Sequence, residues 1–153
     1  MSDSRTGLVS AVTYRDPKAA IAWLERAFGF ELTFLIEDEN GDLAHSQMSH
    51  GGSTIMIGNM WSELHASPAS LGGKTTQTVH IYIAGDVDAH CERAKAAGAE
   101  ILMAPANQFY GSRTYRCRDP EQHIWTVSAD VETVSFEEME QRSGLKIALA
   151  KDA

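Results

Sequence analysis

His80 is the residue in this sequence whose chemistry and setting stand out most clearly. It lies in the segment Val79 to Ile83, where Val79, Ile81 and Ile83 alternate with His80 and Tyr82. Side chains of a β-strand point alternately to its two faces, so His80 and Tyr82 share the face opposite the apolar residues. An imidazole titrates near neutral pH, and His80 could serve as a general base, a ligand contact or a metal ligand. A hydrogen-bonded wall residue is the simpler alternative.

Aromatic side chains supply a second chemical signal. Trp61 follows one predicted strand, and Phe109 and Tyr110 precede another, which places all three at the rim of an expected cavity. Planar small molecules are usually held by apolar and aromatic walls with a few polar groups, although ordinary packing would also explain these residues. Arg113 lies beside Tyr110 and could pair with an anionic ligand group or with a surface carboxylate such as Glu121.

The elements that must position these residues occur twice along the chain. Asp16 and Gly29 are typical of the start and end of a helix, and Asp86 and Gly98 repeat this arrangement in the second half. Apolar and β-branched segments predict strands at residues 9–13, 30–36, 43–49, 54–58, 79–83, 100–103, 112–118 and 123–128. Each half therefore reads βαβββ, which indicates an internal duplication. Because one helix covers only one face of a sheet, we expect an α+β fold whose two paired βαβββ modules form a curved, incomplete barrel around a cavity.

One domain and a tail account for the whole chain. The expected bounds are 7–130 for the domain, about 7–60 for module one, 59–77 for a connector, about 78–130 for module two and 131–153 for the tail. In the tail, the segment Ser135 to Glu138 has the pattern of a capping box, which predicts a short C-terminal helix to about Arg142. A further turn is expected from Leu145 to Ala150. Packing or a subunit contact is the expected role of this tail.

Composition argues against two classes of partner. The formal net charge is -8 and the pI is near 5.1, so neither nucleic acid nor an anionic membrane surface is an expected partner. No apolar run approaches the ~18 residues of a membrane span. The segment Met1 to Thr6 lacks the basic and apolar pattern of a secretion signal. Cys91 and Cys117 are expected to be reduced packing residues, which favours a cytoplasmic protein.

The segment from Asp119 to Trp125, Asp-Pro-Glu-Gln-His-Ile-Trp, together with the paired βαβββ pattern, resembles the vicinal oxygen chelate superfamily. That superfamily contains glyoxalase I, extradiol dioxygenases and bleomycin-resistance proteins. The resemblance covers about residues 7–130. Its most specific pieces, at residues 107–113, 118–125 and 134–139, are similar to a branch of largely uncharacterised glyoxalase-like proteins. Gln122 departs from the family pattern, which usually has Gly there. The resemblance also implies a homodimer, because members commonly pair.

Metal-dependent members of this superfamily hold a divalent ion with His, Gln or Glu from four strands. Carried over to this sequence, those four positions are Val9, Met56, His80 and Thr126. Only His80 can ligate such an ion, and shifting any strand by two residues brings in no carboxylate or imidazole. The resemblance therefore predicts no metal cofactor of the family type.

A small-molecule-binding protein of the glyoxalase and bleomycin-resistance type is the function that these observations favour. We expect it to hold a planar or aromatic ligand in the cavity between the modules. The residues expected to contact that ligand are His80, Tyr82, Met56, Trp61, Phe109, Tyr110, Arg113 and Thr126. The alternative is a glyoxalase-like lyase, isomerase or dioxygenase with His80 as its base or with a non-standard metal site. A scaffold with a filled, vestigial cavity is a third hypothesis.

Overall fold

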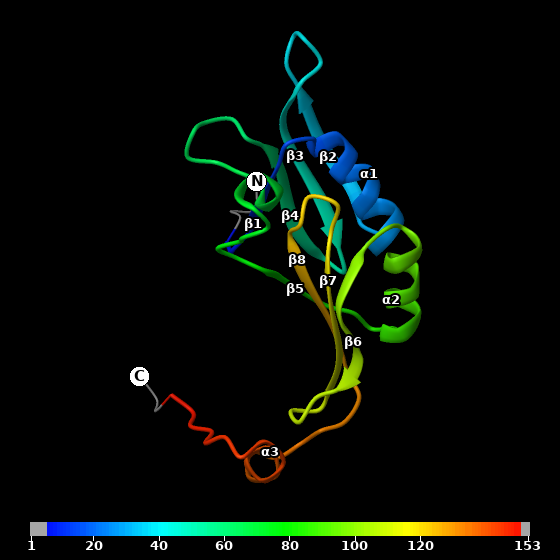
Figure 1. The fold of residues 1–153 in the computed structure, drawn as a ribbon, viewed down its shortest axis with the longest axis vertical. Coiled ribbons are helices and arrows are strands. Elements are labelled where there is room, and N and C mark those ends of the chain that lie inside the picture. Colours follow the sequence, from blue (N-terminus) through cyan, green and yellow to red (C-terminus); the bar gives the residue numbers. More distant parts are fainter. Residues whose placement is uncertain (1–5, 151–153) are drawn as a thin grey trace.

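Both halves of the chain fold as βαβββ modules, as the repeated pattern predicts. A computed structural model describes residues 6–150 (Figure 1). The segment Met1 to Thr6, which lacks the pattern of a secretion signal, therefore lies outside the described part except for its last residue. Module one comprises β1 (Ser10–Tyr14), α1 (Pro17–Phe28), β2 (Glu31–Glu37), β3 (Leu43–His50) and β4 (Ser53–Asn59). Module two comprises β5 (Val79–Tyr82), α2 (Val87–Ala96), β6 (Glu100–Asn107), β7 (Ser112–Arg118) and β8 (Ile124–Asp130). A 3₁₀ turn, η1 (Pro68–Leu71), lies in the connector, and α3 (Phe136–Ser143) lies in the tail.

Each module forms its own four-stranded mixed sheet. The strand orders are β1-β4-β3-β2 and β5-β8-β7-β6, and only the pairs β1–β4 and β5–β8 are parallel. Figure 1 shows α1 and α2 on one side of the sheets, and the connector and the C-terminal tail on the other. We call the face of each sheet that lies away from its helix the open face. The two sheets therefore form a curved, unclosed wall.

Local sequence signals explain both covering helices. The Asp16 side chain accepts a hydrogen bond from the amide of Ala19 at 3.0 Å, and Pro17 occupies the first turn of α1. Asp86 caps α2 in the same way, through the amide of Ala89 at 3.1 Å. Gly29 adopts a left-handed conformation with φ of 71° and ends α1.

The modules are joined through their helices. Trp23 of α1 donates its indole N–H to the carbonyl oxygen of Ala97, just after α2, at 2.7 Å. In return, Arg93 of α2 donates to the carbonyl oxygens of Glu25 and Arg26 in the last turn of α1. Such a contact satisfies carbonyl groups that a helix end leaves without intrahelical partners. The two modules therefore hold each other side by side.

Aromatic rings fill the core between the modules. Phe28 stacks on His90 of α2, with ring centroids 5.4 Å apart, and meets Trp125 of β8 edge-on at 5.3 Å. Both cysteines, Cys91 and Cys117, are free and buried in the same core cluster. This packing puts Trp125 on the helix side of its strand, as the predicted alternation requires.

The turn between β7 and β8 fastens module two to the start of α1. The buried Asp119 carboxylate accepts hydrogen bonds from the Tyr14 hydroxyl at 2.6 Å and from the Trp125 indole at 3.0 Å. Glu121 accepts from the backbone amides of Arg15 and Asp16. A turn predicted only as a chain reversal thus also connects the two modules.

Two local features differ from the sequence-based expectation. Strand β6 continues to Asn107 instead of ending near Met103, because it is an edge strand in which Pro105 can be tolerated without an amide donor. Residues 145–150 form no helical turn, since Gly144 reverses the chain with φ of 70° and an isolated turn is unstable without packing. Within residues 6–150, no helix is both long and apolar enough to cross a membrane.

Candidate ligand site

His80 lies on the open face of the second sheet, at the centre of a small polar network. Its Nε2 atom is 2.9 Å from the Ser128 hydroxyl, which is in turn 2.8 Å from the hydroxyl of Thr114. Burial lowers the pKa of His80 below its usual 6.5, and the positive charge of Arg116 lowers it further. The imidazole is therefore neutral at pH 7 and keeps one ring nitrogen engaged with Ser128.

A pocket lies beside His80 at the seam between the modules. Its volume is about 400 Å³, within the size range of small-molecule sites. Module one contributes Phe30, His50 and Ile55, and module two contributes His80 and Tyr82. The His80 and Tyr82 rings stack on each other in parallel, with centroids 4.9 Å apart, and this ring pair forms one side of the pocket. The pocket is thus a mixed aromatic and polar site formed by both halves of the chain.

His50, the last residue of β3, is a further imidazole that lines this pocket. Its ring lies against Phe30, with centroids 5.0 Å apart. Burial lowers the pKa of His50, so this imidazole is also neutral at pH 7. The sequence showed only a histidine at the end of a strand, and its nearness to His80 depends on how the modules pack.

Arg116 does not line the pocket itself, but it is a second residue near His80 that the sequence did not indicate. It pairs across the sheet with Thr126, which in turn pairs with His80 on the other side. Its Nε atom donates to the Thr126 hydroxyl at 3.2 Å, so the guanidinium extends over β8 towards His80. The observed register pairs Arg118 with Ile124 across residues 119–123, and this register, which the sequence alone does not reveal, places residues 116 and 126 opposite each other.

Two of the expected ligand contacts lie elsewhere on the open faces. Thr126 is buried beneath the Arg116 side chain. Met56 lies on the open face of module one, in a depression of about 520 Å³ that Val9 and Gln47 also line. Neither Met56 nor Thr126 borders the pocket beside His80.

The expected aromatic rim does not come together around this pocket. Trp61 is 72% exposed and packs against His65 of the connector, with centroids 4.3 Å apart. Phe109 and Tyr110 contact each other at the turn between β6 and β7. In Figure 1 the connector and this turn lie towards opposite ends of the molecule, so one small ligand would not span them.

Arg113 forms an ion pair with a carboxylate of the same chain. Its guanidinium donates to both oxygens of Asp88 on α2, at 2.6 and 2.8 Å. The surface pair that the sequence suggested is therefore present, with Asp88 in place of Glu121.

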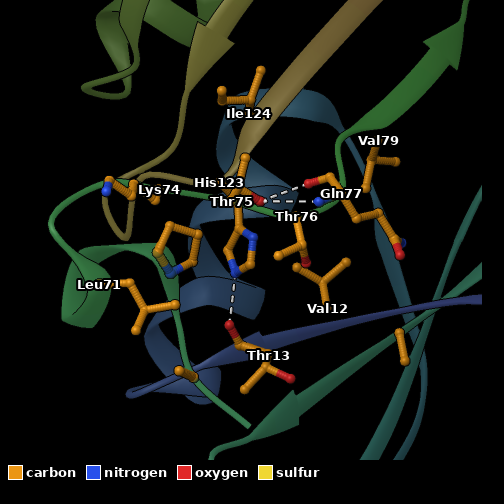
Figure 2. A pocket seen from close by; sticks show the side chains of 13 residues that line it. Val12, Thr13, Leu71, Lys74, Thr75, Thr76, Gln77, Val79, His123 and Ile124 are labelled. Atoms are coloured by element: carbon orange, nitrogen blue, oxygen red, sulfur yellow. Dashed lines mark hydrogen bonds between the residues drawn. The ribbon is translucent and has the colours of Figure 1, made fainter.

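The ring of His123 lies between module one and the connector. Figure 2 shows it in a pocket of about 150 Å³, between β1 and the connector residues that include Lys74 and Thr75. Its Nε2–H donates to the carbonyl oxygen of Thr13 at 2.6 Å. This bond and the contact of His123 with the Tyr14 ring, at 4.6 Å between centroids, indicate a structural role.

The residues at the family metal positions do not fit a divalent ion. Val9, Met56 and Thr126 offer no imidazole or carboxylate, and the Nε2 atom of His80 is already bonded to Ser128. Over residues 6–150, no three side chains of the His, Cys, Asp or Glu type come together as a metal-binding group.

Comparison with known proteins adds to this geometry. Residues 8–127 match the profile of the Glyoxalase/Bleomycin resistance protein/Dioxygenase superfamily. The chain belongs to this superfamily. An uncharacterised protein of Mycobacterium bovis is 31% identical over 129 residues, which cover 82% of this chain and 84% of that protein. An uncharacterised protein of Mycobacterium tuberculosis shows the same identity, over 75% of its own length.

Solved structures of the superfamily share the paired βαβββ fold. TioX from Micromonospora sp. ML1 is 32% identical, with a TM-score of 0.67 over 83% of this chain and 100% of that one. The fosfomycin resistance protein FosX from Listeria monocytogenes, solved with Mn(II) and sulfate, is 21% identical, with a TM-score of 0.59 over 92% and 98% of the two chains. At that identity the second likeness concerns the fold alone.

Proposed function

We propose that this superfamily member binds a planar or aromatic small molecule, without a metal ion, in the pocket at the seam between its modules. The observation that carries the proposal is the setting of His80. The imidazole is the one possible metal ligand among the four family metal positions, and it forms one wall of a pocket of about 400 Å³ with Phe30, His50 and Tyr82. Flat aromatic walls with a few polar atoms favour stacking of planar ligands.

A thermal-shift screen with planar aromatic compounds tests this proposal directly. At least one compound is expected to raise the melting temperature of the wild-type protein, since a ligand that binds only the native state stabilises it. The Tyr82→Ala variant should lose most of the shift, because Tyr82 supplies the flat wall. Leu64→Ala is the matched control, since Leu64 is 93% exposed in the connector and lies outside the pocket. A broad screen without any shift would refute the proposal.

Catalysis by His80 is the second candidate, and the bond between His80 and Ser128 favours it. A neutral imidazole whose orientation is held by a hydroxyl network has the properties of a general base in a lyase or isomerase. A dioxygenase would need a metal bound by unusual ligands, which elemental analysis of the purified protein would detect. Turnover of a candidate substrate that persists in His80→Ala would remove the base hypothesis.

A homodimer is the assembly that we propose. On the open face of module one, Phe34 and Ile36 of the edge strand β2 are 48% and 44% exposed, and their neighbour Leu35 is 40% exposed. Clustered apolar side chains of this kind mark contact surfaces. A second copy of the chain is the occupant that the superfamily resemblance implies. Multi-angle light scattering measures the assembly, and a monomer at micromolar concentration would contradict the proposal.

A further inference from the structure

The strand β7 carries three arginines, and they differ in their partners. Arg113 pairs with Asp88, and Arg118 lies 3.5 Å from Glu100. Within residues 6–150, Arg116 forms no ion pair with a carboxylate, although the chain holds 21 acidic residues against 13 Lys and Arg. Arg116 thus presents an uncompensated positive charge on the open face.

The buried hydroxyl group of Thr126 holds the Arg116 side chain in position. Thr126, 6% exposed, accepts the Nε–H bond of Arg116, and its neighbour on the strand face, Ser128, holds His80. In the described part of the chain, the two terminal nitrogens of Arg116 donate to no protein group. A guanidinium held in this way directs its terminal N–H groups outward, in the fork geometry that matches a carboxylate.

The charged group lies within reach of the seam pocket. Neighbouring strands are about 4.8 Å apart, so β5 and β7 are separated by roughly 10 Å. The bond to Thr126 extends the Arg116 side chain back over β8 and reduces that gap. The positive charge of Arg116 contributes to the lowered pKa of His80, as expected for groups joined through Thr126 and Ser128 on one strand face. A ligand that packs against the His80 and Tyr82 ring pair can therefore place a polar end at Arg116.

We infer that the ligand of this pocket carries a carboxylate, which the terminal nitrogens of Arg116 bind while the aromatic body of the ligand packs against the stacked ring pair of His80 and Tyr82. The inference rests on the proposed binding function and defines its ligand class as planar aromatic acids. The neutral state of His80 suits this arrangement, because the ring then offers a flat uncharged surface next to the single fixed charge. Arg116 in this role determines specificity.

Two isosteric probes test this inference, namely 2-naphthoate and its neutral amide, 2-naphthamide. Isothermal titration of the wild-type protein should show that the acid binds at least about tenfold more tightly, the effect of one charge-assisted bidentate contact. Arg116→Gln should bind both probes alike. Arg116→Lys should retain part of the preference, since it keeps the charge and loses the planar fork.

The matched control is Arg118→Gln, which removes the same charge two residues further along the same strand face. It should keep the wild-type preference for the acid. Melting temperatures of all variants identify any that fail to fold. The inference is overturned if the wild-type protein binds both probes equally, or if the preference survives in Arg116→Gln. The inference is also wrong if neither probe binds while neutral planar compounds do. That result would leave the binding proposal supported. If no planar compound binds at all, the proposed function falls with it.

Discussion

Desolvation lowers the pKa values of three histidines, His50, His80 and His90, and His90 is the clearest case. Its Nδ1 atom is 2.7 Å from the Tyr115 hydroxyl, and its buried Nε2 atom has no hydrogen-bond partner within the described residues. Burial lowers the pKa of His90 to about 4, with smaller effects from His50 and Arg93. The native state therefore binds a proton at this site less readily than the unfolded chain.

This difference predicts that the protein loses stability in mild acid. The contribution of His90 is complete above pH 6.5, the ordinary pKa, and is lost as the pH falls towards 4, because only the unfolded chain gains the proton over that range. Allowing for partial exposure, the loss is about 1–2 kcal/mol. Urea unfolding at pH 7.5 and pH 5 should show a smaller loss for His90→Phe than for the wild type. An unchanged pH dependence in that variant would contradict the explanation.

At Tyr14, a second residue-level prediction concerns the buried bond to Asp119. Burial raises the pKa of Tyr14 well above its usual value, and the nearby Asp119 carboxylate raises it further, so the hydroxyl stays a donor. Tyr14→Phe leaves a buried carboxylate with one bond fewer, which should cost about 1.5–3 kcal/mol of unfolding free energy. Tyr82→Phe is the control, since Tyr82 is 64% exposed. Equal urea midpoints for the two variants would argue against the role of this bond.

At the scale of elements, the turn between β6 and β7 depends on the glycine Gly111. Gly111 has φ of 97°, and a Cβ atom there would lie 2.4 Å from the carbonyl oxygen of Glu132. The amides of Val131 and Glu132 both donate to the Gly111 carbonyl, so the chain after β8 is tied closely to this turn. Gly98 has the same φ of 97° but no atom within 4 Å of its Cβ position.

These two glycines form a matched pair for mutation. Gly98→Ala should cost about 1–2 kcal/mol of stability, which reflects the left-handed backbone alone. Gly111→Ala should cost at least about 2 kcal/mol more, because a backbone segment must also move. Thermal or urea unfolding of both variants gives the comparison. Equal losses would show that the close approach of residues 111 and 132 is not a constraint.

The elements themselves were largely predictable, because local signals determine them. Asp16 and Asp86 mark both helix starts, and alternation in β5 and β8 places Ile81 and Trp125 towards the helices. Gln122 is a position whose conformation such local signals do not predict. It adopts φ of 69°, the sole non-glycine with positive φ among residues 6–150, in a place where a Gly was expected from the family pattern. The turn type follows that of a glycine, held by the bonds that Asp119 accepts from the turn amides.

The site was harder to predict than the elements, since it depends on contacts between distant segments. The alternation of side chains along a strand predicted that His80 and Tyr82 share one face. It could not predict that His50 lines the same pocket, or that Trp61 lies outside it. Arg116 was missed because strand facing alone does not reveal register, and register is what places it opposite Thr126. Phe109 and Tyr110 were expected at the rim because a single cavity was assumed. The two sheets instead form a long, open, curved wall.

At the scale of the whole molecule, the open face of module one predicts a change of assembly on mutation. The double variant Phe34→Lys/Ile36→Lys places two charges on the exposed apolar surface and should convert a dimer into a monomer, because charges are depleted at the centre of protein interfaces. Light scattering at several concentrations measures this. Leu64→Lys, on the connector, should leave the assembly unchanged. A dimer that persists in the double variant would place the interface elsewhere.

The central claim is that the seam pocket binds a planar ligand without a metal ion. It is tested most directly by titrating 2-naphthoate into protein that has been dialysed against EDTA, and into the same protein after addition of Mn²⁺ or Zn²⁺. We predict the same affinity, within about twofold, in all three preparations. His80 and His50 have no third metal-binding side chain beside them within residues 6–150, and the Nε2 atom of His80 is bonded to Ser128. Binding that disappears after EDTA treatment and returns with either metal would contradict the claim.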